Sequence, residues 1–292
     1  MDGELLRHLY HELFHCGKRG LPPRCTYTDA VIVFTYFVAV VSDRSVHWAQ
    51  DRQNWPLWAR RLPRPSYSQL MRRLQTGTIQ RRIEELNTSF RNRLPRTSEK
   101  VVDGKALVIG AHSKDRDAAF GRLAESVWGR GYKLHALVDS AGPIDAFEIT
   151  PLNAGEATIA RQMIESLDLR SIIVRGDANY DSNPLYESVA HRGGQLIAAR
   201  RKPRRSLGHH PQHPHRLLAI KLLEQSPSGL VHHDHYRDRV EQVFAHLTNL
   251  SFGLSPLPNW VRRLDRVTRW IRVKITLYHL FLSLAATTAR VA

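Results

Sequence analysis

Three carboxylates of this chain lie at positions where burial of an acidic side chain costs free energy unless its charge is compensated. Asp103 lies in the apolar segment "KVVDGKALV", Asp177 directly follows "SIIVRG", and Glu241 lies in "HYRDRVEQVFAHL". Burying a carboxylate at a strand or strand end costs free energy unless the carboxylate is ion-paired or bound to a metal ion. The pattern leaves two interpretations open, a shared metal site or separate ion pairs with some of the 43 Lys and Arg residues.

The metal interpretation specifies a chemistry. Oxygen-only ligands suit Mg²⁺ or Mn²⁺ better than zinc, which favours nitrogen and sulfur ligands. Two such ions held by Asp103, Asp177 and Glu241 would activate an attacking oxygen and stabilise a leaving oxygen in phosphoryl transfer. Lys105 and Lys133 would flank this site and could hold phosphates, although solvated surface lysines are an equal alternative.

Glu241 stands beside the apolar stripe of a helix predicted from His235 to Leu247. The stripe consists of Val240, Val243, Phe244 and Leu247. Helical spacing of this kind predicts that the stripe packs on a sheet. Arg237, four residues before Glu241, would lie on the same side of the helix.

The segments around the aspartates predict a mixed sheet covered by helices. From residue 98, "KALVIGAHS", "YKLHALVDSAG" and "DAFEITPL" read as strands, and helical and strand patterns then alternate in the order α-β-α-β. Residues 200–234, with "RRKPRRSLGHHPQHPHR", predict a basic loop followed by a short helix. We therefore predict an α/β domain over residues 98–292 that includes this loop and a C-terminal helical segment.

Residues 1–97 predict a separate all-helical region. Thr28 or Asp29 is a suitable N-cap for the apolar helix that follows. Further along, two short helical patterns meet at a tight connection, and the second carries Arg72 and Arg73. This arrangement could be a helix-turn-helix DNA reader or a plain helical bundle with a basic face.

The overall charge favours a polyanion as partner. Formal net charge is +16 at pH 7. Neutralising phosphates with Lys and Arg releases counterions and steers association, so this composition favours nucleic acid over a merely soluble basic protein.

Membrane insertion and disulfide bonding are not predicted. The longest apolar run, Ala30 to Val41, is too short to span a bilayer, and the N-terminal segment lacks the apolar region of a signal peptide. Cys16 and Cys25 fit neither a zinc site nor a disulfide framework and should be reduced thiols. We expect a cytoplasmic, nucleoid-associated protein.

Several blocks of the sequence resemble the catalytic domain of DDE transposases from bacterial insertion sequences. The blocks are, in order, "VVDGK", "GYKLHALVDSAG" with "ITPLNAGEA", "RGDANYDS" and "YRDRVEQVFAHL". The resemblance implies an RNase H-like fold and a metal-binding acidic triad of Asp103, Asp177 and Glu241. It also implies that Mg²⁺ or Mn²⁺, as two ions, is the cofactor.

The same resemblance assigns DNA contacts. Arg237 matches the family's arginine, which is implied to contact a DNA phosphate. The family's tyrosine is expected at Asp234, and Tyr236 is the nearby tyrosine that we include among the DNA-binding residues. The family's lysine is expected at Thr248, so this chain lacks one cation for gripping DNA ends.

The leading functional hypothesis is a transposase that binds element ends and target DNA as double-stranded DNA. It would cleave DNA to release a 3′-hydroxyl and join that hydroxyl to a target phosphodiester, and bringing two ends together implies a homodimer on DNA. The alternatives are a DNA-binding relative with weakened catalysis and a metal-dependent nuclease that cuts without joining.

Overall fold

The structure is a computed structural model of the chain. It describes residues 2–15, 26–124, 126–202, 206–207, 209–225, 227–254 and 256–291. Cys16 and Cys25 lie outside the described residues. The chain forms two compact units, which we call the helical unit (Met1–Leu94 with Asn249–Ala292) and the sheet unit (Pro95–Thr248).

The helical unit is built from both ends of the chain. Its α-helices in the described ranges are α1 (Asp2–Phe14), α2 (Asp29–Val41), α3 (Tyr67–Leu74), α4 (Gly77–Arg91) and α9 (Leu264–Val291). Short 3-10 turns η1 (Trp48–Gln50), η2 (Arg52–Asn54) and η3 (Leu57–Ala59) lie between α2 and α3. Thr28 caps α2 by accepting a hydrogen bond from the amide of Val31 at 3.3 Å, which is one of the two caps expected.

Helix α9 belongs to the helical unit, whereas the sequence pattern had grouped it with the predicted α/β domain. It packs against α4 and α2, and polar side chains of α9 are used inside this unit. His279 and Asn87 are joined by a 2.8 Å hydrogen bond, and the buried Lys274 is ion-paired with Asp43. Because α9 is buried on nearly every side between Val267 and Leu280, it needs the N-terminal helices as partners.

The sheet unit contains a mixed sheet of the RNase H-like kind. Its strands are β1 (Glu99–Ile109), β2 (Ala119–Ala124), β3 (Val127–Asp139), β4 (Ile144–Pro151), β5 (Ile173–Gly176) and β6 (Gln195–Ala198). The order is β2-β3-β1-β5-β6, and β4 also pairs with β3. β3 is antiparallel to β1, β2 and β4, whereas β1, β5 and β6 are parallel to one another.

The predicted strand order is found with one addition. β2 forms a hairpin with the first half of β3 and was not predicted. Its sequence, "AFGRLA", is short and interrupted by glycine, so it lacks the alternation by which strands are detected.

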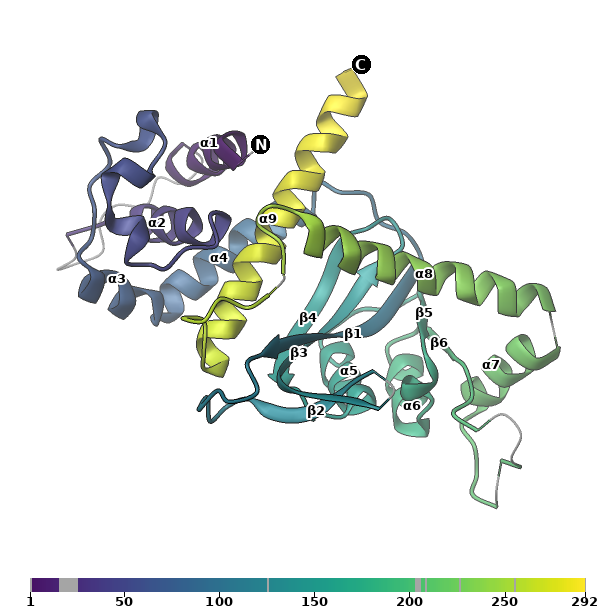
Figure 1. Cartoon of the computed structure of the whole chain (residues 1–292). Coiled ribbons are helices and arrows are strands. Elements are labelled where there is room, and N and C mark those ends of the chain that lie inside the picture. Colours follow the sequence, from purple (N-terminus) through teal and green to yellow (C-terminus); the bar gives the residue numbers. More distant parts are fainter. Residues whose placement is uncertain are drawn as a thin grey trace. The chain divides into compact units, whose positions relative to one another are not determined.

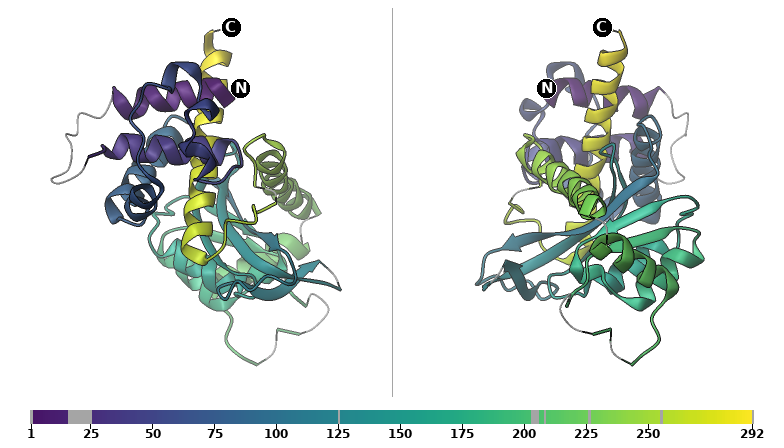
Figure 2. Two further views of the ribbon diagram at one scale, coloured as in Figure 1. Left: turned by 60° about the vertical axis from the view of Figure 1, so that its left-hand side comes forward. Right: turned by 90° about the vertical axis from the view of Figure 1, so that its right-hand side faces the viewer.

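Helices lie on both faces of the sheet (Figure 1, Figure 2). α5 (Glu156–Ile164) and α6 (Asn183–His191) cover one face, where the buried cluster includes Val102, Val174 and Leu196. α8 (Pro227–Asn249) runs along the other face, and α7 (Pro214–Gln225) follows the β6 edge. The basic loop is thus shorter than predicted, because Pro214 and Pro227 start helices as first-turn prolines do.

Among the described residues, no helix is long and apolar enough to cross a membrane.

Candidate active site

Asp103 and Asp177 come together because two strands run in parallel. Val101 of β1 is opposite Arg175 of β5 in the register. Two residues further along, the same register reaches Asp103, within β1, and Asp177, directly after the end of β5, so the two residues lie side by side. Alternation also places Val101 and Asp103 on the face opposite Val102, which is the face that α8 follows.

The carboxyl of Asp103 is held in a strongly perturbed environment. Burial raises the pKa of Asp103 to about 6, and the nearby negative charges of Asp177 and Glu156 add to the rise. The Gly104 amide, which donates a 2.7 Å hydrogen bond to Oδ1, and the Arg237 guanidinium act in the opposite direction. A carboxylate in such a place favours a bound cation.

Asp177 is fixed by the turn that follows β5. Its Oδ1 accepts a hydrogen bond from the Asn179 amide at 2.8 Å and caps the 3-10 turn η4 (Ala178–Tyr180). Burial raises the pKa of Asp177, and the charge of Glu156 acts in the same direction. The Asn179 amide, Arg237 and Arg201 lower it.

Glu156 is a third carboxylate at this site, and the sequence analysis did not include it. Glu156 begins α5, and its Oε1 lies 2.7 Å from Lys133 Nζ in an ion pair. A Cβ at Gly104 would lie 3.1 Å from the same oxygen, so the glycine leaves room for Glu156 on the face of β1 opposite to the Asp103 side chain. The signal was present in the block "ITPLNAGEA", where Glu156 follows Gly155.

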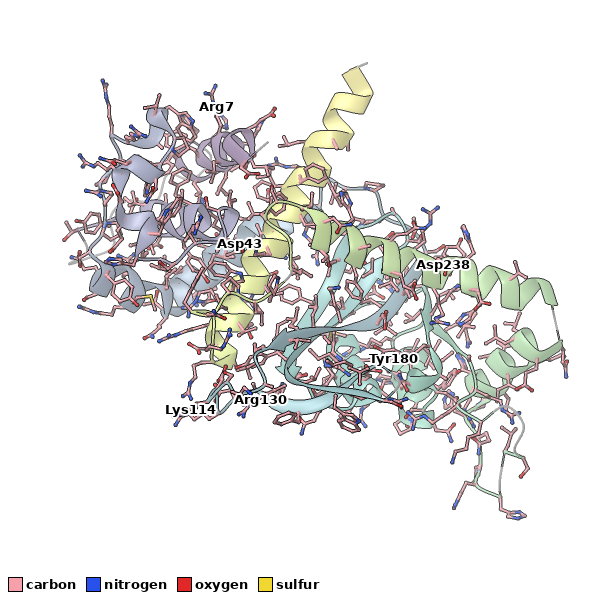
Figure 3. The ribbon with its side chains drawn as sticks, viewed as in Figure 1. Arg7, Asp43, Lys114, Arg130, Tyr180 and Asp238 are labelled. Carbon is pink, nitrogen blue, oxygen red and sulfur yellow. The ribbon has the colours of Figure 1, made fainter. Side chains whose placement is uncertain are left out.

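Tyr180 brings a hydroxyl close to these carboxylates. The residue is fully buried under the sheet, on the side away from α8 (Figure 3). Its pKa is raised by burial and by the charges of Asp103, Glu156 and Asp177. Within the described part of the chain, the Tyr180 hydroxyl has no hydrogen-bond partner.

Arg237 and Lys105 supply positive charge next to the aspartates. Arg237, on α8, acts electrostatically on both Asp103 and Asp177. Lys105 lies two residues after Asp103 on β1, and its Nζ is 5.9 Å from the centre of the Phe244 ring of α8. Burial lowers the pKa of Lys105, and Asp103 raises it.

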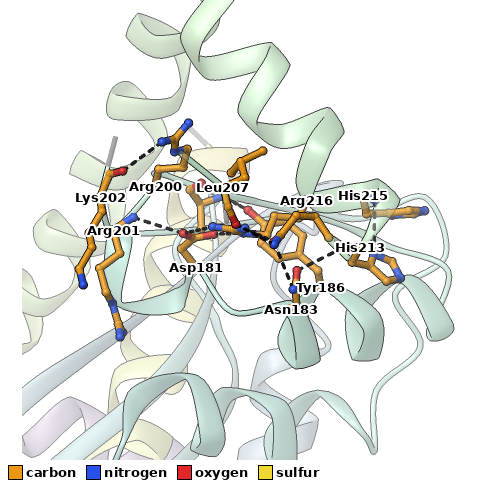
Figure 4. Close-up of polar contacts among 12 residues, drawn as sticks. Asp181, Asn183, Tyr186, Arg200, Arg201, Lys202, Leu207, His213, His215 and Arg216 are labelled. Carbon is orange, nitrogen blue, oxygen red and sulfur yellow. Dashed lines mark hydrogen bonds and ion pairs between the residues drawn. The ribbon is translucent and has the colours of Figure 1, made fainter. Parts of the chain in front are cut away.

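A network centred on Asp181 holds the basic segment near Asp177 (Figure 4). Arg216 contacts both carboxylate oxygens of Asp181, at 2.6 and 2.7 Å. The amide of Arg201 donates to Asp181 at 3.2 Å, and the Arg201 guanidinium donates to the Asn179 carbonyl at 3.2 Å. These contacts anchor Arg201 in the turn that carries Asp177.

Comparison with known proteins identifies the family. The sequence model of the family described as "Transposase DDE domain" matches residues 95–280, more than half of the chain. The chain belongs to this family. No curated protein matches the chain.

One solved structure supports the fold of this DDE transposase. The cryo-EM structure of the piggyBac transposase synaptic complex with hairpin DNA is similar, with a TM-score of 0.54 and 11% sequence identity. The match covers 99% of this chain and 73% of that chain. The Mos1 transposase paired-end complex with left transposon end also matches, at 12% identity over 92% of this chain and 81% of that chain, but with a TM-score of 0.25.

Glu241, the third carboxylate predicted for the transposase site, lies on α8 one turn after Arg237. Its side chain is exposed, and the charges that act on Asp103 and Asp177 come from Glu156, Arg237 and Arg201. The structure therefore brings two of the three predicted carboxylates together.

Tyr236, predicted to contact DNA, packs against the sheet of the transposase. The Arg175 guanidinium lies 4.8 Å from the centre of its ring, and Arg175 is ion-paired with Glu99 at 2.8 Å. One turn earlier on α8, His233 is buried beside Arg175 and Arg237, and burial together with these charges lowers its pKa to about 4. This cluster holds α8 on β5.

The other predicted DNA-binding residues lie in different surroundings. Lys133 is ion-paired with Glu156 at the site described above. In the helical unit, Arg73 is ion-paired with Asp29 and donates to the Tyr27 carbonyl at 3.1 Å, whereas the adjacent Arg72 is exposed.

The donor set fits a hard divalent cation in its chemistry. Asp103, Asp177 and Glu156 offer only oxygen atoms. Burial, together with nearby negative charge, raises the pKa values of both aspartates, and a bound cation would act in the opposite direction. In the described ranges, no group of three or more His, Cys, Asp or Glu side chains is arranged to hold a metal ion. Asp103 and Asp177 are the two predicted carboxylates that the structure places on neighbouring strands.

Proposed function

We propose that this transposase cleaves DNA and transfers the resulting strand end of an insertion sequence into target DNA, using Asp103 and Asp177 as the metal-binding core. The observation that carries the proposal is a pair of carboxylates on neighbouring parallel strands, Asp103 within β1 and Asp177 directly after β5, with the pKa of Asp103 raised to about 6. Mg²⁺ or Mn²⁺, as two ions, would supply Lewis-acid chemistry for phosphoryl transfer.

The protein's own residues would place the DNA backbone at this site. Arg237 is a cation beside both aspartates, so a phosphate approaching them would meet its guanidinium. Lys105 offers a second cation on the same strand as Asp103.

The third acidic ligand is Glu241 in our proposal, and Glu156 is the competing candidate. Glu241 carries the family resemblance and lies one turn beyond Arg237 on α8. Glu156 lies among the charged groups that already act on both aspartates. Since Lys133 neutralises Glu156 in the structure, a structural ion pair is the alternative role for that carboxylate.

The proposed DNA partners are the element ends and the target, both double-stranded, with two copies of the chain acting together. Arg72 is an exposed cation at the end of α3, directly before the short connection to α4. We propose that α3 and α4 contribute to end recognition.

Replacing Asp177 with Asn tests the central assignment. Asp177→Asn should abolish Mg²⁺-dependent cleavage of a duplex containing the element end, because the amide cannot bind the cation as a carboxylate does. The affinity for that duplex should remain, because phosphate contacts by Lys and Arg are unchanged. Cleavage by the variant at the wild-type rate would refute the proposal.

The variants Glu241→Gln and Glu156→Gln identify the third ligand in the same assay. If Glu241 is the ligand, Glu241→Gln abolishes cleavage and Glu156→Gln leaves measurable activity. The reverse result assigns the role to Glu156. Since Glu241 is exposed, its replacement should leave the thermal stability unchanged.

Because Thr248 stands where the resemblance implies a lysine that grips DNA ends, strand transfer should be tested separately from cleavage. The Thr248 hydroxyl donates to the Phe244 carbonyl at 2.6 Å within α8, and the lysine implied by the resemblance is missing there. Supplying element ends that already carry a free 3′-hydroxyl measures strand transfer alone. Products of transfer support the transposase, whereas cleavage without joining identifies a nuclease.

A further inference from the structure

The hairpin of β2 and β3 carries an alternating pattern of aromatic and arginine side chains on one face. The antiparallel register places Phe120 opposite Arg130 and Arg122 opposite Trp128. Residues directly opposite each other, and residues two apart along a strand, project from the same face. These four side chains therefore form one patch, which we call the aromatic-arginine face. Arg130, labelled in Figure 3, lies at the far end of the sheet from α7.

The opposite face of the same hairpin packs against Leu152 of the sheet unit. Gly121 is opposite Gly129 in the register. A Cβ at Gly121 would lie 2.7 Å from the Leu152 side chain, and one at Gly129 would lie 2.6 Å from the Leu123 side chain. The glycines let the hairpin pack closely on Leu152, which is buried, so the aromatic-arginine face is the one that points outward.

The exposure of the two rings is unusual for such large apolar side chains. Trp128 is 68% exposed and Phe120 is 57% exposed. The Arg130 guanidinium lies 5.8 Å from the centre of the Phe120 ring, and Arg122 is exposed. Exposed rings with arginines between them match the stacking platforms on which proteins hold nucleobases, because every base has a π-face and every nucleotide has a phosphate.

The face is connected to the candidate active site. β3 carries both Trp128 and Lys133, which project from opposite faces of the strand, and Lys133 is the ion-pair partner of Glu156. An open hollow of about 830 Å³ is lined by Arg122 of the hairpin together with Lys133, Glu156 and Arg201. The hollow is also lined by Asn179 and Asp181 of the turn that follows Asp177, so a DNA strand lying in it would pass from this turn to Arg122 of the hairpin.

We propose that the aromatic-arginine face binds unpaired bases of a DNA strand that leaves the active site, with Trp128 and Phe120 stacking on the bases and Arg122 contacting phosphate. A duplex could also meet a two-stranded β-ribbon in its major groove, but stacked base pairs would leave the flat rings without a partner. The proposal rests on DNA as the substrate of the proposed function and is independent of which residues bind the metal.

The test compares two DNA probes in the full-length protein. One is a blunt duplex, and the other is the same duplex with a 3′ single-stranded overhang, both measured by fluorescence anisotropy with EDTA present so that cleavage plays no part. Wild type should bind the overhang DNA more tightly than the blunt DNA. Trp128→Ala should lose about ten-fold in affinity for the overhang DNA and less than about two-fold for the blunt duplex.

Three further variants serve as controls. Trp128→Phe keeps an aromatic ring and should retain the preference for the overhang. Arg122→Gln should weaken binding to both probes equally and lower the salt dependence by about one phosphate contact. Leu218→Ala removes another exposed apolar side chain, 48% exposed on α7, and should change neither affinity.

The outcomes separate this inference from the proposed function. Equal affinity of Trp128→Ala and wild type for the overhang DNA would overturn the inference, as would an equal loss for both probes. A change from dimer to monomer in Trp128→Ala without a change in overhang preference would also overturn it, since the face would then join two copies. If Asp177→Asn still cleaves DNA while Trp128→Ala loses the preference, the metal assignment fails and the inference stands.

Discussion

At the scale of single residues, the burial of Asp103 costs stability whenever its carboxyl is ionised. Its folded-state pKa is about 6, against an ordinary value of 3.8. The folded chain thus prefers the neutral acid, and ionisation costs stability progressively as the pH rises from the ordinary pKa to the folded pKa. Above the folded pKa the full cost is present unless a cation offsets it.

We therefore expect Asp103→Asn to be more stable than wild type at neutral pH in the absence of divalent metal. The gain should be on the order of 1–3 kcal/mol at about pH 7.5, and it should vanish below about pH 4, where the wild-type carboxyl is protonated in both states. Thermal unfolding followed by circular dichroism with EDTA present measures it. Addition of Mg²⁺ should stabilise wild type and leave the variant unchanged.

The matched control is Asp238→Asn, at an exposed position of α8. It should change the stability at neither pH. Lower stability of Asp103→Asn at both pH values would show that the ionised carboxylate is a structural ion-pair partner.

The sequence identified Asp103 and Asp177 because each belongs to a local strand motif. Glu156 was not predicted as a site residue, because its position depends on how α5 packs over Gly104 and no local sequence pattern encodes that packing. Glu241 was assigned by resemblance, and its exposed side chain leaves that assignment to the cleavage assay.

At the scale of elements, α8 is held on β5 by charged and aromatic contacts as well as by its apolar stripe. The buried Arg175 joins Glu99 on β1 to the Tyr236 ring on α8. Arg237 follows Tyr236 directly, so this contact fixes the position from which Arg237 reaches the aspartates.

Two substitutions of Tyr236 separate an anchoring role from the predicted DNA contact. Tyr236→Leu should lower the free energy of unfolding by about 1 kcal/mol, because it removes the cation–π contact with Arg175. Tyr236→Phe keeps the ring and should retain both stability and DNA affinity. Weaker DNA binding by Tyr236→Phe at unchanged stability would instead show that the hydroxyl contacts DNA. Chemical denaturation and anisotropy give the two readouts.

Regular elements were predicted where the pattern was strong. The order of β1, β3, β4, α5, β5, α6 and β6 followed from alternation and turn residues. The sequence pattern did not predict β2 or the start of α8, because the histidine-rich segment at the start of α8 was predicted to be part of a loop. β2 is stabilised by its pairing with β3, and its own composition carries little signal.

At the scale of the whole molecule, the family match and the compact units have different boundaries. The match ends at residue 280, whereas the sheet unit ends at Thr248. The sequence could not show this, because α9 has the same helical pattern whichever unit it joins.

Two fragments test the assignment of α9. A fragment of residues 95–280 keeps α9 up to Leu280 without α1, α2 and α4, so its buried side chains would face water. It should self-associate and bind an apolar dye such as ANS, whereas a fragment of residues 95–248 should remain monomeric. Light scattering after size-exclusion chromatography distinguishes them. A monomeric 95–280 fragment that binds no dye would contradict the assignment.

The position of α9 also has a consequence for synthesis on the ribosome. The sheet unit is continuous in the chain, so it can finish folding while translation is still in progress. The N-terminal helices emerge first, yet their partner α9 emerges only after the entire sheet unit. Asp43 and Asn87 therefore lack their partners Lys274 and His279 until α9 has been synthesised, and the helical unit completes its folding last. If α3 and α4 recognise element ends as proposed, the nascent chain carries a finished sheet unit before its end-recognition surface is complete.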